Sequence, residues 1–516
     1  MPRKICPECN QKDTSWNWCK PCNSKHFQND FNNWTSGDNK INKLIQDAQL
    51  NADRNWKVIE WIPFDKFKEV KQIGRGGFGT IHYARWIDER IRKWDIENQR
   101  WERYRKEVEV ALKKFDYFVN FNDVLNEMEI HLKIYTRSNI TSIRFYGITQ
   151  DPETHSYMMV LQYAADGNLR EYLKINSNNI NWEQKLDKLW ELSFNLRNIH
   201  GLDIVHQDFH PGNILSSNFK YAINISDFGL SKLIVANPNN PEKKNIFGVL
   251  PYIAPEVLSG DEEYTKAADV YSFGIIAYEI VTGFPPYPNI PHNKDLAMKI
   301  CNGLRPKIPF HTPKLITRTI MKCWDARVTY RPTFNELNNE LHKYWNDYRY
   351  FKDSEIRIQI ENSEKLSKNL GLTNSTTPTP LNYQTHPQAI YTSRLLDFSK
   401  LPKPKNEENF ERKLEELTKS TSALSIVASK LHNSQEPGLR YDDDDDGDDN
   451  DGDNDEWEER VAIFGDHMLG CYDGFIWLSL MLKWQKDILV DADHKNGLIL
   501  NAIVRCQYFN PLFGSS

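Results

Sequence analysis

A glycine-rich loop at residues 74–79 limits the possible folds more than any other feature of this chain. Gly74, Gly76 and Gly79 form a GxGxxG pattern directly after a strand-like run, and loops of this kind let backbone N–H groups approach phosphates. In dinucleotide-binding folds the same pattern opens a helix. Here residues 80–85 alternate and include β-branched side chains, which favours a second strand. The sequence therefore predicts a hairpin whose turn covers phosphates.

Residues 64–346 alternate strand-like runs with longer helical ones, which indicates an α+β fold. Strand patterns occupy residues 57–62, 67–73, 107–115 and 157–163. Asn181 is followed by Gln184 at the third helical position, the pattern of a capped helix start. A domain that contains a sheet and several helices is therefore expected.

Cysteines are concentrated near the N-terminus as two CxxC pairs, formed by Cys6, Cys9, Cys19 and Cys22. Each pair can form a tight turn that directs two thiolates to one ion, so residues 1–36 are predicted to form a small zinc knuckle with four sulfur ligands. The alternative is a set of reduced cysteines without metal. Trp16 and Trp18 are interpreted as the cover of this metal site rather than as a stacking platform for nucleic-acid bases.

Further motifs follow the glycine loop in a fixed order. They are ValAlaLeuLys ending at Lys113, Glu127, HisGlnAspPheHisProGlyAsn at 206–213, AspPheGly at 227–229, AlaProGlu at 254–256, AspValTyrSerPheGly at 269–274 and Arg331. Together they resemble the protein-kinase catalytic domain, and the resemblance covers residues 64–346. It implies a bilobal fold, with a small β-rich lobe and a large helical lobe.

Within the kinases, the chain is most similar to the tyrosine-kinase-like group. This placement uses the AspValTyrSerPheGly motif and the CysTrpAspAla stretch at residues 323–326. The N-terminal knuckle, the linker at residues 32–37 and the form of the catalytic loop are also similar to a large set of fungal kinases.

The resemblance implies a role for each matching residue. Asp208 is expected to accept the hydrogen bond of the substrate hydroxyl, Lys113 to bind the α- and β-phosphates of ATP, and Glu127 to orient Lys113. Asp227 and Asn213 are expected to hold Mg²⁺ or Mn²⁺. The ATP site is expected to comprise Lys113 together with Ile73, Gly74, Arg75, Gly76, Gly77, Phe78, Gly79, Ile81, Ala111, Leu161, Gln162, Tyr163, Ala164, Asn168 and Leu215.

Three further residues are expected to have structural roles. Asp269 is expected to anchor the backbone of the catalytic loop from a buried helix. Glu256 and Arg331 are expected to pair inside the large lobe. These roles also follow from the resemblance and not from the spacing alone.

The catalytic loop departs from the family pattern at Gln207. Most kinases carry an arginine there, which binds a phosphate on the activation segment. Residues 227–256 offer only Ser231 and Tyr252 as hydroxyl acceptors, and Tyr252 matches a structural aromatic position. We therefore expect that activity does not require phosphorylation of this segment.

Two other departures bear on catalysis and on the choice of substrate. His210 stands where serine/threonine kinases usually carry lysine, so a neutral imidazole is expected to donate a hydrogen bond to the γ-phosphate. Val249 replaces a threonine that is usual in serine/threonine kinases. A serine or threonine hydroxyl is favoured as the acceptor, because the stretch around Tyr252 lacks the ProValLysTrp pattern of tyrosine kinases, and tyrosine stays open.

The remaining segments differ strongly in composition. Residues 37–63 carry apolar side chains at helical spacing and are predicted to form a linker helix. In residues 347–460 the apolar periodicity fades into Asn, Ser, Thr and Pro, and the segment ends in an acidic run at 442–459 that contains no basic residue, so it is expected to be a disordered tail. Residues 461–516 regain apolar side chains and form a short segment of unknown fold.

Two segments have both a functional and a neutral interpretation. Residues 88–106 are an insertion rich in Trp and Arg, which is either a partner surface or a longer hairpin, and the hairpin is favoured. The acidic run is either an autoinhibitory mimic of substrate or a solvated spacer, and the spacer is favoured.

The longest apolar stretches are shorter than the roughly 20 residues that cross a bilayer, and no secretory signal is evident, so a cytoplasmic location is expected, with nuclear access open. The sequence predicts an ATP- and Mg²⁺-dependent protein kinase in intracellular signalling. The alternatives are a pseudokinase or nucleotide-binding signalling scaffold, and a zinc-dependent adaptor. Expected partners are a protein substrate and signalling proteins bound by the knuckle or the tail, whereas nucleic acid is not expected.

Overall fold

The computed structural model describes residues 5–15, 17–76, 79–104, 107–116, 121–137, 141–233, 246–369, 385–398 and 400–419. All of these belong to one compact unit, residues 5–435. The predictions for Trp16, Gly77, Phe78, the acidic run 442–459 and residues 461–516 lie outside the described residues. Among the helices that are described, none combines the length and the hydrophobicity of a membrane-spanning segment.

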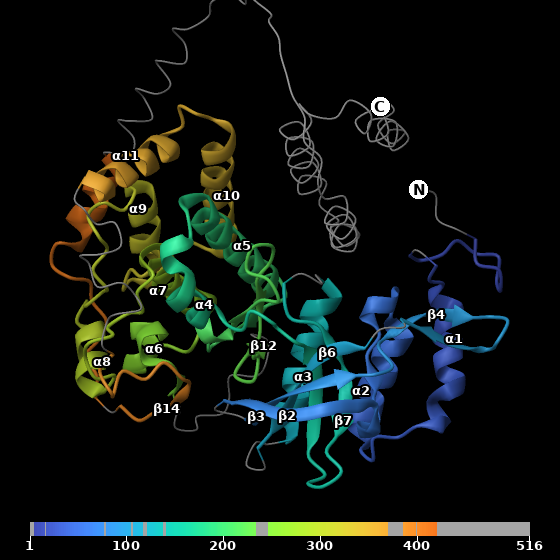
Figure 1. Cartoon of the computed structure of the whole chain (residues 1–516). Coiled ribbons are helices and arrows are strands. Elements are labelled where there is room, and N and C mark those ends of the chain that lie inside the picture. Colours follow the sequence, from blue (N-terminus) through green and yellow to red (C-terminus); the bar gives the residue numbers. More distant parts are fainter. Residues whose placement is uncertain are drawn as a thin grey trace, which may run out of the picture. The chain divides into compact units, whose positions relative to one another are not determined.

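A six-stranded sheet forms the small lobe (Figure 1). Its order is β1-β7-β8-β6-β3-β2, and neighbours are antiparallel except β1 and β7. The strands are β1 (Glu60–Trp61), β2 (Phe67–Arg75), β3 (Gly79–Trp86), β6 (Val108–Phe115), β7 (Phe145–Gln150) and β8 (Tyr157–Gln162). The predicted strand patterns therefore correspond to real strands, and the glycine loop joins β2 to β3 in a hairpin, as predicted.

One helix of the small lobe, α3 (Phe121–Arg137), packs onto this sheet. Its Val124 and Met128 belong to a buried cluster with Phe145 on β7 and Met159 on β8. The apolar side chains lie on the face that the helical spacing predicts. Glu127 lies between Val124 and Met128 in the sequence, so this packing fixes the position of Glu127 relative to the sheet.

Helices build the large lobe around α7 (Lys266–Thr282), which is buried over most of its length. Its main partners are α5 and α9. The large-lobe helices are α4 (Leu169–Asn176), α5 (Trp182–His200), α6 (Pro255–Ser259), α7, α8 (Lys294–Cys301), α9 (Lys314–Cys323), α10 (Phe334–Tyr350) and α11 (Glu355–Asn369). The predicted N-cap of α5 is confirmed, because Asn181 and Gln184 form a reciprocal capping box.

Short strands complete the large lobe near residues 206–213. They are β9 (Ile204–Val205), β10 (Ile214–Leu215), β11 (Asn224–Ile225), β12 (Lys232–Leu233), β13 (Ile246–Gly248) and β14 (Arg394–Leu396). They pair as β9 with β12, β10 with β11 and β13 with β14. The last pair joins two parts of the chain that are far apart in sequence.

The N-terminal segment adds α1 (Lys20–Asp30) and α2 (Asn39–Asn51) to the small lobe. The helix predicted within residues 37–63 is confirmed as α2, which begins at the N-cap Asp38. Ile41 and Ile45 are fully buried and belong to the same cluster as Val124 and Met128 of α3. The predicted linker is therefore part of the small-lobe core.

The insertion at residues 88–106 forms a hairpin of β4 (Ile91–Asp95) and β5 (Arg100–Arg103), as the favoured interpretation stated. Its two tryptophans contact α1. The Trp94 ring stacks on His26 with centroids 4.0 Å apart, and the Trp101 ring stacks on Phe27 at 4.2 Å. The insertion thus packs against the cysteine-rich segment of the same chain.

Trp18 lies within the same contact region. It is 1% exposed, and its Nε1 donates a hydrogen bond to the Ala52 carbonyl oxygen over 2.9 Å. Its ring centroid lies 6.4 Å from that of Phe27 and 6.0 Å from that of Trp101. This tryptophan is a core residue of the N-terminal segment, so its faces are not available to stack on bases.

The expectation of a disordered tail at residues 347–460 is wrong for residues 347–369, 385–398 and 400–419. Ile356 and Ile360 of α11 are 1% and 0% exposed, and both belong to the large-lobe core. Leu396 and Phe410 are each 4% exposed in the same core. The average composition of the segment did not indicate this order. Only a few apolar side chains, widely spaced in the sequence, pack on a core that other helices already form.

The parallel pairing of β1 with β7 depends on Gly147. A Cβ added there would lie 2.0 Å from the carbonyl oxygen of Glu60. We predict that Gly147→Ala separates β1 from the sheet. The steric clash is expected to lower the free energy of unfolding by roughly 1–3 kcal/mol, in addition to the loss caused by backbone strain, as measured by urea denaturation.

Gly167→Ala is the matched control for this prediction. Gly167 also has a positive φ, 70°, but an added Cβ there meets nothing within 4 Å. Its substitution is expected to cost only the strain of the left-handed backbone, about 1–2 kcal/mol. Equal losses in the two variants would contradict the steric explanation.

Candidate active site

Two acidic side chains, one from each lobe, contact one buried ammonium group. Lys113 lies on β6, Glu127 on α3, and Asp227 in the turn between β11 and β12. Lys113 Nζ donates to Glu127 Oε1 over 2.6 Å and to Asp227 Oδ1 over 2.8 Å. Lys113 and Glu127 are 5% and 1% exposed. The structure therefore brings these three predicted site residues into direct contact.

Burial and mutual attraction set the charges of this trio. Burial alone would lower the pKa of Lys113, but the carboxylates of Asp227 and Glu127 outweigh it and raise that pKa above its usual value. Burial raises the pKa of Glu127 to about 7, against the effect of the Lys113 charge. Burial also opposes ionisation of Asp227, yet Lys113 holds the pKa of that carboxyl below its usual value. Lys113 therefore stays protonated and Asp227 stays a carboxylate.

The predicted catalytic residue Asp208 lies in a loop whose backbone is hydrogen-bonded to Asp269. The Asp269 carboxylate accepts from His206 N over 2.9 Å and from Gln207 N over 3.2 Å, which confirms its predicted anchoring role. Gln207 has a φ of 66°, a left-handed conformation that costs a non-glycine residue about 1–2 kcal/mol. Asn213 Nδ2 donates to the Asp208 carbonyl oxygen over 2.9 Å. Asp208 and Asn213 are thus held together in a loop whose backbone is strained at Gln207.

A stack of buried rings connects α3 to this loop. The ring of Phe228, which is fully buried, lies 4.8 Å from that of His131 and 5.1 Å from that of His206. Burial lowers the pKa of His131 to about 3, so its ring is neutral and packs as an apolar group. Sequence reasoning missed this stack, although His131 lies one turn after Glu127 on the same helix face. The position of α3 is therefore coupled to the AspPheGly segment.

His210 turns its ring toward Asp208. Its Nδ1 accepts from Gly212 N over 3.0 Å, so the ring nitrogen that can donate is Nε2. Nε2 lies 3.5 Å from Asp208 Oδ1 and 3.0 Å from Ser393 Oγ. Ser393 Oγ donates to Asp208 Oδ2 over 2.5 Å. Sequence reasoning missed Ser393, because nothing in its neighbourhood indicates that it reaches the catalytic loop.

These contacts set the charge state of Asp208. Burial alone would raise the pKa of Asp208, but the interaction with His210 and the hydrogen bonds from His210 and Ser393 hold that pKa below its usual value. Asp208 is thus a buried carboxylate that is already engaged with a hydroxyl group. That is the hydrogen bond expected between Asp208 and a substrate.

Strand register brings several predicted ATP-binding residues together. Ile81 on β3 faces Lys113 on β6, and Ala111 on β6 faces Leu161 on β8. In the large lobe a backbone bridge joins Asn168 to Leu215 on β10. Asn168 also caps α4, because its side chain accepts from the backbone of the first helical turn.

The connection between the lobes is tied to the large lobe through Ser217. Its Oγ donates to the Tyr163 carbonyl oxygen over 3.1 Å, and Gln162 Nε2 donates to the same Oγ over 3.3 Å. Ala164 follows, and its carbonyl oxygen accepts from Gly167 N over 3.0 Å. The predicted hinge segment 162–164 thus lies directly between β8 and α4.

The described part of the glycine loop forms a tight turn. Gly76 N donates to the Gly79 carbonyl oxygen over 2.9 Å, and Ile73, Gly74 and Arg75 belong to β2. A Cβ added at Gly79 would lie 2.0 Å from the Lys114 carbonyl oxygen. At this position the glycine is therefore required by the close approach of β3 and β6, in addition to any contact with phosphate.

The two hydroxyl groups of the activation segment are both internal. Ser231 is 1% exposed, and its Oγ donates to the His206 carbonyl oxygen over 3.0 Å. Tyr252 is 2% exposed, and its hydroxyl donates to Glu279 Oε2 over 2.5 Å. These positions are structural donors in this conformation, which agrees with the expectation that neither serves as an activating phosphate site.

The predicted pair of Glu256 and Arg331 is confirmed. Arg331 Nη1 donates to Glu256 Oε1 over 2.6 Å and Nη2 to Oε2 over 2.7 Å. The two side chains are 3% and 0% exposed, so the pair is desolvated and bidentate. It joins α6 to the segment before α10.

The four N-terminal cysteines form a cluster. Their Sγ atoms all lie within 4.8 Å of one another, with Cys6 and Cys22 3.8 Å apart and Cys9 and Cys19 3.6 Å apart. A tetrahedral zinc site with Zn–S bonds of about 2.3 Å requires sulfur atoms about 3.8 Å apart. The donor set and its spacing therefore fit a tetrahedral zinc ion.

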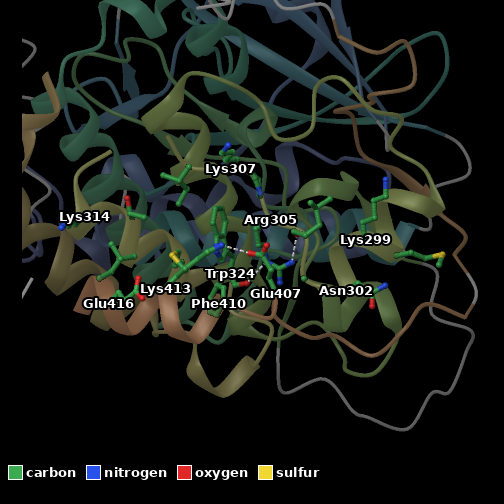
Figure 2. A pocket seen from close by; sticks show the side chains of 18 of the residues that line it. Lys299, Asn302, Arg305, Lys307, Lys314, Trp324, Glu407, Phe410, Lys413 and Glu416 are labelled. Carbon is green, nitrogen blue, oxygen red and sulfur yellow. Dashed lines mark hydrogen bonds and ion pairs between the residues drawn. The ribbon is translucent and has the colours of Figure 1, made fainter. Parts of the chain in front are cut away.

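A separate cavity of about 1260 Å³ lies in the large lobe, between α8, α9 and the helical residues 410–419 (Figure 2). Its wall carries both signs of charge, and in Figure 2 Lys413 forms an ion pair with Glu407 at 3.0 Å. None of the predicted catalytic, ATP-binding or cysteine residues lines it. It is therefore distinct from the candidate active site.

Comparison with known proteins agrees with this geometry. The family model of protein tyrosine and serine/threonine kinases matches residues 67–341, more than half of the chain. The chain is 28% identical over 280 residues to the tyrosine-protein kinase SPK-1 of Girardia tigrina, covering 53% of this chain and 52% of that protein.

Two further relatives are named as serine/threonine kinases. A protein of Acanthamoeba polyphaga mimivirus, named as serine/threonine-protein kinase/receptor R826, is 28% identical over 296 residues, or 56% of this chain and 16% of that protein. A Dictyostelium discoideum protein, named as serine/threonine-protein kinase pats1, is 28% identical over 291 residues, or 55% of this chain and 8% of that protein. The chain thus spans from 8% to about half of the length of these three relatives.

We predict that Arg331→Met lowers the free energy of unfolding by about 3–5 kcal/mol, because it leaves the carboxylate of Glu256 buried without its cation. Urea denaturation followed by fluorescence measures this loss. Lys343→Met removes an exposed ion pair with Asp347 and serves as the control. The control is expected to change stability by less than about 1 kcal/mol, and a comparable loss in both variants would contradict the role of burial.

Proposed function

Because the chain belongs to the protein tyrosine and serine/threonine kinase family, we propose that it is an active protein kinase, which transfers the γ-phosphoryl group of ATP to a hydroxyl group of a protein. The observation that carries this proposal is the buried contact of Lys113 with Glu127 and Asp227. These groups supply the phosphate-binding cation, its orienting partner and a carboxylate for a metal ion.

ATP would supply the phosphoryl group, and Mg²⁺ would neutralise the negative charge of the phosphates. Asp227 and Asn213 are the proposed metal ligands, and their carboxylate and amide oxygens are donors that Mg²⁺ prefers. Asn213 supports this assignment because its amide nitrogen is turned toward Asp208, which leaves the amide oxygen for a cation. Lys113 is proposed to bind the α- and β-phosphates, with Glu127 holding the ammonium in place.

Asp208 is proposed to orient the attacking hydroxyl and to receive its proton. Its depressed pKa keeps it ionised, so it accepts the hydroxyl hydrogen bond. His210 is proposed to assist by donating from Nε2, the nitrogen that carries the ring proton. Because its ring faces Asp208 and the acceptor hydroxyl, its contribution is to position the hydroxyl rather than to add a fixed positive charge at the γ-phosphate.

The preferred acceptor is proposed to be serine or threonine. The names of the mimivirus and Dictyostelium relatives support this preference, and the planarian tyrosine kinase is the reason to test tyrosine as well. We also propose the tyrosine-kinase-like group as the placement of this chain, together with similarity to fungal kinases that carry an N-terminal knuckle. A cytoplasmic location and signalling partners at the knuckle or the tail belong to the same proposal.

The N-terminal cysteines are proposed to hold one structural zinc ion. The sulfur separations of 3.6 Å and 3.8 Å support a tetrahedral site closed to substrate. The role of the ion is to stabilise the segment that packs on the β4–β5 hairpin. Cys6, Cys9, Cys19 and Cys22 are the four proposed ligands.

We predict that Asp208→Asn reduces phosphate transfer from labelled ATP to a mixed Ser, Thr and Tyr peptide library by roughly 100- to 10,000-fold, because it removes the base that orients the hydroxyl. EDTA is expected to abolish transfer in the unaltered protein. Asp261→Asn, on the exposed surface of the large lobe, is the matched control and is expected to retain activity. Absence of metal-dependent labelling, with ATP still raising the melting temperature, would instead indicate a nucleotide-binding scaffold.

We predict that the purified protein contains one zinc ion per chain, measured by elemental mass spectrometry. Cys6→Ser combined with Cys22→Ser is expected to lose the ion and to lower the melting temperature, because the segment loses the bonds that fold it. Cys471→Ser, which leaves the N-terminal cysteines unchanged, is the control and should retain the zinc. A full zinc content in the double variant would exclude this ligand set.

A further inference from the structure

A distant part of the chain lies extended beside the catalytic loop. β14 pairs with β13 in antiparallel register, with Gly248 facing Arg394. β13 belongs to the activation segment, and a Cβ added at Gly248 would lie 3.3 Å from Asp208 Oδ1. The strand pairing therefore carries Ser393, the residue before β14, to the side of Asp208. An extended peptide that adds a strand to this edge is a common mode of peptide recognition.

Ser393 makes the hydrogen bonds that an acceptor hydroxyl needs before phosphoryl transfer. Its Oγ donates to Asp208 Oδ2 over 2.5 Å and contacts His210 Nε2 over 3.0 Å. Because Gly212 N donates to His210 Nδ1, Nε2 carries the proton and is the donor to Ser393. These two bonds use the hydroxyl proton and one lone pair, and the second lone pair is left for attack on phosphorus.

Residues before Ser393 are held by the large lobe. The Tyr391 hydroxyl donates to the Pro286 carbonyl oxygen over 2.8 Å. The guanidinium group of Arg170 lies 4.4 Å from the centre of the Tyr391 ring, and His292 packs edge-on against that ring at 4.7 Å. Tyr391 therefore occupies a formed site two residues before the acceptor.

Residues after Ser393 are held equally well. The Arg394 guanidinium donates to the His292 carbonyl oxygen over 2.5 Å, and Leu396 is 4% exposed in the large-lobe core. Between these anchors, Thr392 is exposed and Leu395 is 52% exposed. Ser393 is thus positioned by anchors on both sides, and its contact with Asp208 does not depend on its hydroxyl alone.

We propose that Ser393 is a phosphorylation site that the active site of the same chain modifies in cis. The inference rests on the proposed kinase function. In the reaction, Ser393 Oγ forms a bond to the γ-phosphorus of ATP as the bond from that phosphorus to the β–γ bridging oxygen breaks, with ADP as the leaving group. The hydroxyl proton passes to Asp208 Oδ2 and then to solvent. The products are phosphoserine at position 393 and ADP, and no other reactant is required.

Ser393 occupies the acceptor position and therefore competes with other protein substrates. A protein substrate needs the same contact with Asp208 and the same edge of β13, so it competes with residues 391–396 for both. The local concentration of a tethered segment is high, in the millimolar range for a flexible tether, so the cis reaction precedes reactions in trans.

The test starts from full-length protein that has been treated with phosphatase and repurified. After incubation with ATP and Mg²⁺, mass spectrometry of proteolytic peptides measures phosphate at Ser393, and the same sample is assayed on a Ser/Thr peptide library. Stoichiometric phosphate at Ser393 is expected, at a first-order rate that does not change over about a hundredfold dilution, because a cis reaction does not depend on concentration. Ser393→Ala is expected to lose this phosphate, and Thr392→Ala, altered at the exposed neighbour, to retain it.

A mixing experiment separates cis from trans. Mass-tagged unaltered protein is incubated with untagged Asp208→Asn chain, and the untagged chain is expected to stay unphosphorylated at Ser393. Phosphate on the untagged chain would overturn the cis reaction. Phosphorylation of the library without phosphate at Ser393 would overturn the inference and leave the kinase function intact. Absence of both would overturn the kinase function and this inference with it.

Discussion

The buried ammonium group of Lys113 is the interaction on which the rest of the site depends. It is the shared partner of Glu127 on α3 and of Asp227 in the large lobe, so it ties both lobes to one point. Removing it would leave two acidic groups close together in a desolvated position, and an uncompensated buried charge costs several kcal/mol. The position of α3, the conformation of the AspPheGly segment and the stack around Phe228 therefore all rely on this contact.

The N-terminal segment packs against the helix that carries Glu127. Ile41 and Ile45 of α2 share a buried cluster with Val124 and Met128, which flank Glu127 on its helix. α1 and the β4–β5 hairpin pack against one another through stacked rings, and β1 extends the sheet through β7. The segment that composition describes as a linker is therefore part of the core on which α3 packs.

Local patterns in the sequence were enough to predict the parts of the fold that local interactions determine. The β2–β3 hairpin, the capping box of α5 and the pair of Glu256 and Arg331 follow from spacing, turn chemistry or family motifs. Ser393 could not be found in this way, because it meets Asp208 across 185 residues of sequence and only the folded chain brings them together. The same reason explains why the stacking of Trp94 on His26, and the burial of α11 in a region of polar composition, were not foreseen.

A phosphate on Ser393 would not stay where the hydroxyl group now lies. It carries a charge of about −1.5 to −2 at neutral pH and would stand directly beside the carboxylate of Asp208, in a position from which water is largely excluded. His210 offers one N–H there, from Nε2, and the Arg394 guanidinium is engaged with a backbone carbonyl. The contact that aligns the acceptor is therefore destroyed by its own product, and residues 391–396 would leave the edge of β13 to other substrates. Ser231 and Tyr252 of the activation segment are internal. Phosphorylation of Ser393, in the tail, would therefore control the access of other substrates to Asp208.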